Sequence, residues 1–275
     1  MKGNLFLRVV SALVLGPVVL AAILCNEGDS SVTFSLLISV LGALMSWEWE
    51  KMISSKTTAV SVALTMMSSS IAFLMTKFDP LWALALVVFT ALFIYLNFGH
   101  RILLSFGAFY IGLPLLSMMY IAYYSGSNDL SYSYTYVLWL IFVVWATDIG
   151  GYVFGKSIGG PKLVPKISPK KTWAGLIGGM FFAAVVTYIF VLTMKHYYAS
   201  QMNMLFLVSS SIILAIVSQI GDIFESSIKR RMNLKDSSQL IPGHGGIFDR
   251  VDGLLFASVV MAVYFLVMNN LHIKG

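Results

Sequence analysis

The chain has 275 residues, of which 58% are hydrophobic and only 11% are charged, and its mean hydropathy is +0.85. About a quarter of the residues in a soluble domain are charged. This composition therefore excludes an ordinary soluble protein and predicts an integral membrane protein. The single cysteine, Cys25, excludes an internal disulfide.

Nine apolar runs are candidate membrane spans, since a helix needs roughly 20 apolar residues to cross a bilayer core about 30 Å thick. Lipid offers no partner for free backbone groups, so we expect an all-α polytopic fold. The first run has no small-x-small cleavage site, and we interpret it as an uncleaved span rather than a signal peptide. In chain order the runs cover residues 5–24, 32–47, 58–76, 80–97, 102–124, 132–149, 174–194, 203–221 and 253–271.

The distribution of lysine and arginine predicts the orientation. With nine spans and a cytoplasmic N-terminus, fifteen of the eighteen basic residues face the cytoplasm, and only Lys77, Lys195 and Lys274 face the other side. This asymmetry agrees with the positive-inside rule. The net charge of +6 is then explained by topology and anionic headgroups, and we expect no nucleic-acid partner.

A segment rich in tryptophan, Trp47-Glu48-Trp49-Glu50-Lys51, ends the second run. We interpret it as an aromatic anchor at the membrane surface, where tryptophan is enriched. Glu48 or Glu50 could instead support a functional site, but no spacing in the sequence requires this.

Residues 148–173, DIGGYVFGKSIGGPKLVPKISPKKTW, form the first predicted cytoplasmic loop. It contains a formal Walker A match, Gly150-xxxx-Gly155-Lys156-Ser157. That motif binds phosphate only between a strand and a helix of an α/β domain. Because a membrane span precedes it here, we reject a P-loop. Two interpretations remain: a glycine- and proline-rich turn with positive-inside lysines, or a flexible basic lid over phosphates, formed by residues 168–172.

Residues 218–252 hold five of the twelve acidic residues and five of the eighteen basic ones. Asp222 ends the eighth run, and Ser226 and Lys229 follow on the same helical face. Asp249 and Asp252 open the ninth run, three residues apart. Spans eight and nine run in opposite directions, so we expect these three carboxylates to converge. They would repel unless a cation lies among them, and oxygen ligands suit magnesium, which also bridges substrate phosphates.

Basic residues and glycines lie between these carboxylates. Lysine and arginine bind phosphate oxygens, and glycine lets backbone amides come close to a ligand. The alternative is a positive-inside loop in which acids pair with bases and Pro-Gly makes a turn. The set as a whole favours a magnesium–phosphate site at the membrane surface; it comprises Lys229, Arg230, Arg231, Lys235, Pro242, Gly243, His244, Gly245 and Gly246.

The same stretch resembles the signature of the CDP-diacylglycerol synthases, also called phosphatidate cytidylyltransferases. Residues 226–252 read SSIKRxxxxKDxSxxIPxHGGIFDRVD and show no departure from that signature over 27 positions. Residues 148–156, 168–172 and 219–226 are similar to further blocks of the family. The strong resemblance covers about residues 145–260.

The resemblance implies that the chain converts CTP and phosphatidate into CDP-diacylglycerol and pyrophosphate at the cytoplasmic face of a bacterial inner membrane, with a divalent cation. Asp222 and Asp249 would be the leading metal carboxylates, and Asp252 would support them or hold a second cation. The expected cofactor is Mg²⁺, and the expected partners are CTP, phosphatidate and membrane lipid. A homodimer is left open.

These expectations give a domain division and a set of site residues. Residues 1–130 should form about five N-terminal helices, and residues 131–275 a catalytic transmembrane region with cytoplasmic loops 148–173 and 222–252. The expected catalytic residues are Asp222, Lys229, Asp249 and Asp252. The expected substrate-binding residues are Lys170, Lys171, Ser226, Arg230, Lys235, His244, Gly245, Gly246 and Arg250.

Three other functions would use or require similar sequence features. A CTP-dependent lipid-alcohol kinase would use similar groups but needs a base for its hydroxyl substrate. An ion-coupled transporter should carry its charges near the bilayer midplane in broken helices, whereas here the acids lie at the ends of spans. A CDP-alcohol phosphotransferase would need a DxxDG…GxxxDxxxD pattern, which the sequence lacks.

Overall fold

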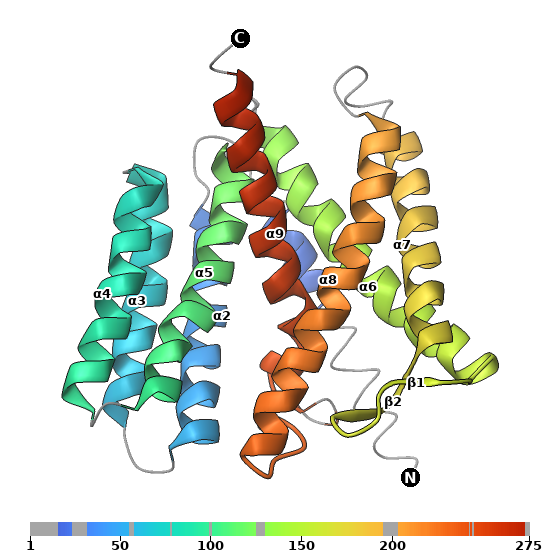
Figure 1. Ribbon diagram of the computed structural model, residues 1–275. Coiled ribbons are helices and arrows are strands. Elements are labelled where there is room, and N and C mark those ends of the chain that lie inside the picture. Colours follow the sequence, from blue (N-terminus) through green and yellow to red (C-terminus); the bar gives the residue numbers. More distant parts are fainter. Residues whose placement is uncertain are drawn as a thin grey trace. The chain divides into compact units, whose positions relative to one another are not determined.

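The computed structural model describes residues 16–23, 32–54, 58–77, 79–98, 101–124, 130–194, 203–241, 243 and 245–272. Residues 16–23 are helical. The remaining elements, in chain order, are α2 (Val32–Ile53), α3 (Thr58–Lys77), α4 (Pro80–Asn97), α5 (Ile102–Tyr124), α6 (Leu130–Ser157), β1 (Lys162–Val164), β2 (Ser168–Thr172), α7 (Trp173–Met194), α8 (Met204–Arg231) and α9 (Phe248–His272) (Figure 1).

The predicted class, an all-α polytopic membrane protein, is confirmed with one addition. Seven of the described helices, α2 and α4–α9, are long and apolar enough to cross a membrane, and α3 contains a shorter apolar stretch, Ala59–Met75. The addition is the antiparallel hairpin of β1 and β2. Of the first predicted span, 5–24, only residues 16–23 are described; the rest lies outside the described part of the chain.

The chain divides into two compact units. The first consists of Met1–Tyr124 and Arg231–Val251, and the second of Ser125–Arg230 and Asp252–Gly275. Residues 231–251 are thus grouped with the N-terminal helices in the first unit.

The first unit is a bundle of α2–α5. Helix α2 packs against α3 and α5, and both of these pack against α4 (Figure 1). The start of α4 is fixed locally: Asp79 is its N-cap and accepts a hydrogen bond from the Leu81 backbone N–H at 2.8 Å, and Pro80 occupies the first helical position. Both residue types are favoured there, because the cap satisfies an unpaired backbone donor and proline lacks one.

The prediction that this segment is an aromatic anchor at the membrane surface agrees with the exposed side chain of Trp47. It is wrong for Trp49, whose side chain is buried. Trp47 is 43% exposed, and the Lys51 ammonium lies over its ring, 4.7 Å from the centroid. Trp49 is fully buried, and its ring lies 5.4 Å from that of Tyr110 and 6.0 Å from that of Phe248. Residues two positions apart in a helix point in different directions, so the two tryptophans cannot share one environment.

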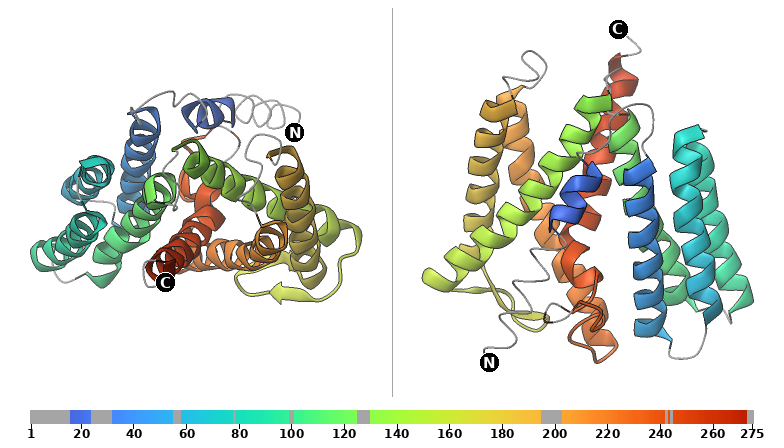
Figure 2. Two further views of the ribbon diagram at one scale, coloured as in Figure 1. Left: turned by 90° about the horizontal axis from the view of Figure 1, so that it is seen from above. Right: turned by 180° about the vertical axis from the view of Figure 1, so that it is seen from behind.

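In the second unit, α6 and α7 pack closely side by side (Figure 2). Helix α6 continues through residues 148–157, so the first predicted loop begins after Ser157 rather than at Asp148. The formal Walker A match is therefore helical, which confirms that it is not a P-loop. Its glycines serve packing instead: a Cβ at Gly150 would lie 2.5 Å from the Gly178 carbonyl oxygen of α7.

The basic segment 168–172, for which we considered a turn or a flexible lid over phosphates, is strand β2. It pairs with β1, with Lys162 opposite Thr172 and Val164 opposite Ser168. Thr172 also caps the start of helix α7, because its hydroxyl accepts a hydrogen bond from the Gly175 backbone N–H at 3.0 Å. The hairpin is thus joined directly to the capped start of α7, and this connection fixes the position of the hairpin's lysines.

Helices α8 and α9 approach each other at two glycines within the second unit. A Cβ at Gly221 would lie 2.6 Å from the Asp252 carbonyl oxygen, and a Cβ at Gly253 would overlap the Ser218 hydroxyl. From this crossing the two helices diverge (Figures 1 and 2). The crossing places Asp222 and Asp252, each adjacent to one of these glycines, at the same level.

The α6–α7 contact predicts different effects at two neighbouring glycines. Gly150→Ala should lower the apparent unfolding temperature in detergent, because overpacking against the α7 backbone costs about 1–3 kcal/mol. Gly151→Ala is the matched control: its Cβ would meet the Gly175 carbonyl oxygen at 3.6 Å, an ordinary contact. Alanine favours helix over glycine by about 1 kcal/mol, so this variant should be neutral or stabilised. Equal effects of the two changes would contradict the packing.

Candidate active site

Four carboxylates gather in the second unit. Asp222 and Glu225 lie on α8, Asp252 on α9 and Asp148 on α6, and Asp252 interacts electrostatically with each of the other three. The side-chain amide of Gln219, on α8, donates a hydrogen bond to Asp148 Oδ1 at 3.5 Å. The sequence predicted Asp222 and Asp252 at this place, and the structure adds Asp148 and Glu225, which were not among the predicted site residues.

Two lysines pair with these carboxylates. Lys171 of β2 lies 2.6 Å from Asp222 Oδ2, and its ammonium also donates to the Gln219 carbonyl oxygen at 3.4 Å. Lys229 lies 3.1 Å from Glu225 Oε1, and both residues are buried. Each lysine therefore compensates the charge of one carboxylate, and the two carboxylates lie on successive turns of α8.

The predicted helical face on α8 is confirmed. Ser226 donates a hydrogen bond to Asp222 Oδ1 at 3.2 Å, across one turn of the helix. Lys229 follows one turn later, as expected from its spacing. It is only 6% exposed, however, so the structure presents it as the buried partner of Glu225 rather than as an open phosphate ligand.

These charges fit a divalent cation. Four carboxylates lie near one another in the second unit, and two lysines pair with two of them. Carboxylates held together favour a bound cation. Among the described residues there is no group of three or more His, Cys, Asp or Glu side chains arranged to hold a metal. Magnesium needs only one or two carboxylates when substrate phosphates and water complete its ligands, so Asp222 and Asp252 suit it.

Asp249 belongs to the first unit, where it organises the second loop. Its Oδ2 accepts hydrogen bonds from the Gly246 backbone N–H at 2.8 Å, from the Ser237 backbone N–H at 2.9 Å and from the Ser237 hydroxyl at 3.0 Å. Helix α9 begins at Phe248, so Asp249 and Asp252 both lie near its start, as predicted. Asp249 is therefore a loop-ordering residue in addition to any role at a metal.

The role of Glu48 does not follow from the sequence alone. Its carboxylate is fully buried and accepts hydrogen bonds from the hydroxyls of Ser237 at 3.2 Å and Ser238 at 2.5 Å. It also accepts from the backbone N–H groups of Ile247 at 2.8 Å and Phe248 at 2.9 Å. One carboxylate thus joins residues 237–238, inside the loop that precedes α9, to residues 247–248 at its end. An ionisable residue beside a predicted span was the signal that could have found it.

The structure explains why glycine occupies two positions of this loop. Gly245 has a φ of +85°, which favours glycine, and a Cβ there would lie 2.6 Å from Asp249 Oδ2. A Cβ at Gly246 would overlap both the Ser237 hydroxyl and the Glu48 carboxylate. At these two positions, glycine lets the backbone come close to two carboxylates of the protein itself, those of Asp249 and Glu48.

The remaining predicted substrate ligands are mostly exposed. Lys170 and Arg230 are exposed in the second unit, and Lys235 and Arg250 in the first. Arg230 lies near the end of α8 and Arg250 near the start of α9, whereas Lys170 lies in β2 and Lys235 in the loop after α8; exposed cations of this kind suit phosphate oxygens. His244 lies outside the described residues.

Comparison with known proteins identifies the family. The model of the cytidylyltransferase family matches residues 6–268. The chain belongs to this family. A phosphatidate cytidylyltransferase of Brucella melitensis is 34% identical over 95% of this chain and 93% of its own length. Proteins of the same name from Rickettsia bellii and Staphylococcus aureus are 43% and 44% identical over 45% and 44% of this chain, and over 56% and 45% of their own lengths. The family predicted from residues 226–252 is confirmed.

The Glu48 contacts predict that Glu48→Gln weakens the hydrogen bonds that order residues 237–248. The amide would place a donor against other donors, at a cost of about 1–3 kcal/mol. Backbone amides of residues 237–248 should then exchange hydrogen faster, and turnover should fall. Glu50→Gln is the control, because buried Glu50 accepts instead from the Ser61 backbone N–H at 3.0 Å. Unchanged exchange in residues 237–248 of Glu48→Gln would contradict the assigned role.

Proposed function

We infer that the chain catalyses the reaction for which its relatives are named: it transfers the cytidylyl group of CTP to phosphatidate and gives CDP-diacylglycerol and pyrophosphate. The observation that carries this inference is the set of carboxylates and lysines around Asp222 and Asp252, in a chain that belongs to the cytidylyltransferase family. Such a set suits a reaction between two phosphate-bearing substrates.

In the proposed reaction, a phosphate oxygen of phosphatidate attacks the α-phosphorus of CTP. A new phosphorus–oxygen bond forms, the bond from the α-phosphorus to the bridging oxygen breaks, and pyrophosphate leaves with that electron pair. The nucleophile is already an anion, so no strong general base is needed. The protein must instead hold two polyanions in line and neutralise the growing charge.

Asp222 and Asp252 are the proposed magnesium ligands in the second unit, and Asp249 remains a proposed ligand from the start of α9. The bound ion would supply positive charge to the CTP phosphates. Alternatively, Asp252 would hold a second cation. Ser226 orients the Asp222 carboxylate through the hydrogen bond between them.

The basic residues bind phosphate in this proposal. Lys171, beside Asp222, and Lys170, its neighbour on β2, steady the departing pyrophosphate. Lys229 contributes positive charge from beside Glu225. Substrate contacts are also proposed for Arg230, Lys235, His244, Gly245, Gly246 and Arg250.

The proposed setting is a bacterial inner membrane, with nine spans, a cytoplasmic N-terminus and both charged loops in the cytoplasm, where CTP is available. Phosphatidate keeps its acyl chains in lipid and presents its headgroup at the membrane surface. The fifteen-to-three distribution of basic residues supports this orientation.

Labelled CTP tests the reaction directly. Purified protein in detergent, given phosphatidate and magnesium, should move label from the α-phosphate of CTP into lipid and release label from the γ-phosphate as pyrophosphate. Transfer of γ-label into lipid would instead indicate a lipid kinase and would overturn the proposal.

Removing a proposed metal ligand should abolish the reaction. Asp222→Asn keeps the side-chain shape but loses the charge, and Asp249→Asn should act likewise, each with a loss of more than about tenfold, or about 1.4 kcal/mol. The control is Asp79→Asn, since asparagine is also a good N-cap and Asp79 caps α4. If either site variant retained more than about a tenth of normal turnover at saturating magnesium, its assignment as a metal ligand would be wrong.

The orientation predicts opposite labelling of two cysteines in a Cys25→Ser background. Gln239→Cys, at an exposed position of the second loop, should resist an impermeant thiol reagent in intact cells and react in inverted vesicles. Lys274→Cys, beyond α9, should show the reverse. Labelling of both from one side would mean an even number of spans, and labelling of position 239 from outside would exclude a cytoplasmic site.

A further inference from the structure

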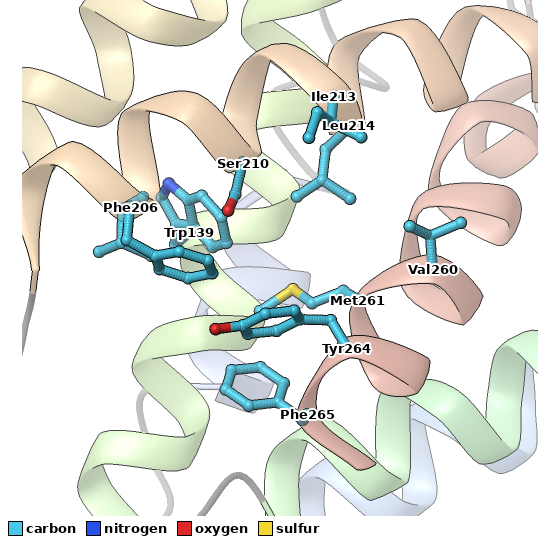
Figure 3. Close-up of a pocket in the computed structure, with 10 residues that line it drawn as sticks. Trp139, Phe206, Ser210, Ile213, Leu214, Val260, Met261, Tyr264 and Phe265 are labelled. Atoms are coloured by element: carbon cyan, nitrogen blue, oxygen red, sulfur yellow. The ribbon is translucent and has the colours of Figure 1, made fainter. Parts of the chain in front are cut away.

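An apolar cavity of about 140 Å³ lies in the second unit among α6, α8 and α9 (Figure 3). Aromatic and aliphatic side chains from all three helices line it, and Ser210 contributes a hydroxyl. Its lining includes Trp139 of α6, Phe206 and Leu214 of α8, and Met261 and Phe265 of α9. A cavity of this composition suits a hydrocarbon ligand.

The cavity has a buried floor and an exposed rim. Trp139 is 2% exposed, and Leu214 and Met261 are each 4% exposed. Ile213 and Val260, which also line the cavity, are 57% and 39% exposed. Their exposure means that the cavity opens on the apolar side of the helices, where lipid would enter it.

The position of the cavity along the helices relates it to the carboxylates. Leu214 and Ser210 precede Asp222 on α8, and Val260 and Phe265 follow Asp252 on α9. At about 1.5 Å per residue, these positions lie about 12–20 Å from the carboxylates along the helix axes. Half of a hydrocarbon core about 30 Å thick is about 15 Å. The cavity is therefore at the depth reached by the ends of acyl chains whose headgroup lies at the carboxylates.

We propose that this cavity binds the distal part of one acyl chain of phosphatidate and so contributes to the choice of chain length. The proposal rests on the proposed function, because it takes the headgroup to lie at Asp222 and Asp252. The divergence of α8 and α9 from their crossing at Gly221 and Gly253 opens the space for the chain beyond its headgroup. Two half-buried aromatic side chains of the lining, Phe206 and Tyr264, are held by packing, because their rings stack with centroids 4.7 Å apart.

Filling the cavity tests the proposal. Ser210→Phe should lower kcat/KM for dipalmitoyl phosphatidate by about tenfold, which corresponds to lost contact with about two methylene groups. Dioctanoyl phosphatidate, with chains half as long, should be turned over as by the wild type. The matched control is Ser209→Phe, an identical change at an exposed neighbour that does not line the cavity.

Val260→Phe, which fills the cavity from α9, is the second variant in case Ser210→Phe does not fold. Selective loss with the long-chain substrate in either folded variant supports the proposal. Equal loss for both substrates, or the same profile as Ser209→Phe, overturns it and means that the cavity holds only bulk lipid. Failure of the wild type to convert either substrate would instead overturn the proposed function.

Discussion

The close crossing of α8 and α9 is the constraint on which the site in the second unit depends. Gly221 and Gly253 leave no room for a Cβ, so the helix backbones meet beside Asp222 and Asp252. Carboxylates held this close at the end of apolar helices repel each other unless cations compensate them. Lys171 and Lys229 supply part of that compensation, and a divalent ion would supply the rest.

In the first unit, two carboxylates order a polar loop that lies beside apolar helices. Glu48 accepts hydrogen bonds from the Ser238 hydroxyl and from two backbone amides of the loop, and Asp249 accepts from two other backbone amides. The Ser237 hydroxyl lies within hydrogen-bond distance of both carboxylates and shares its one proton between them. Buried carboxylates are tolerated when they are fully hydrogen-bonded. The loop's glycines and serines are thus explained by the two carboxylates that they surround.

Hydropathy and charge predicted most of the architecture, because burial in lipid requires long apolar helices. The start of α9 and the shared face of Asp222 and Ser226 followed from spacing alone. The continuation of α6 to Ser157 was missed, since helical turns outside lipid carry no hydropathy signal. Glu48 could not be assigned, because its partner Ile247 lies 199 residues away in the chain. Local spacing carries no information about such a contact.

Cation binding tests the central claim most directly, namely that the carboxylates at the α8–α9 crossing hold a divalent ion. Mn²⁺ accepts the same oxygen ligands as Mg²⁺ and its binding can be followed by electron paramagnetic resonance. In the presence of CTP, the wild-type protein should bind Mn²⁺, and Asp222→Asn should bind it at least about tenfold more weakly. Equal affinity of the wild type and Asp222→Asn for Mn²⁺ would contradict the account.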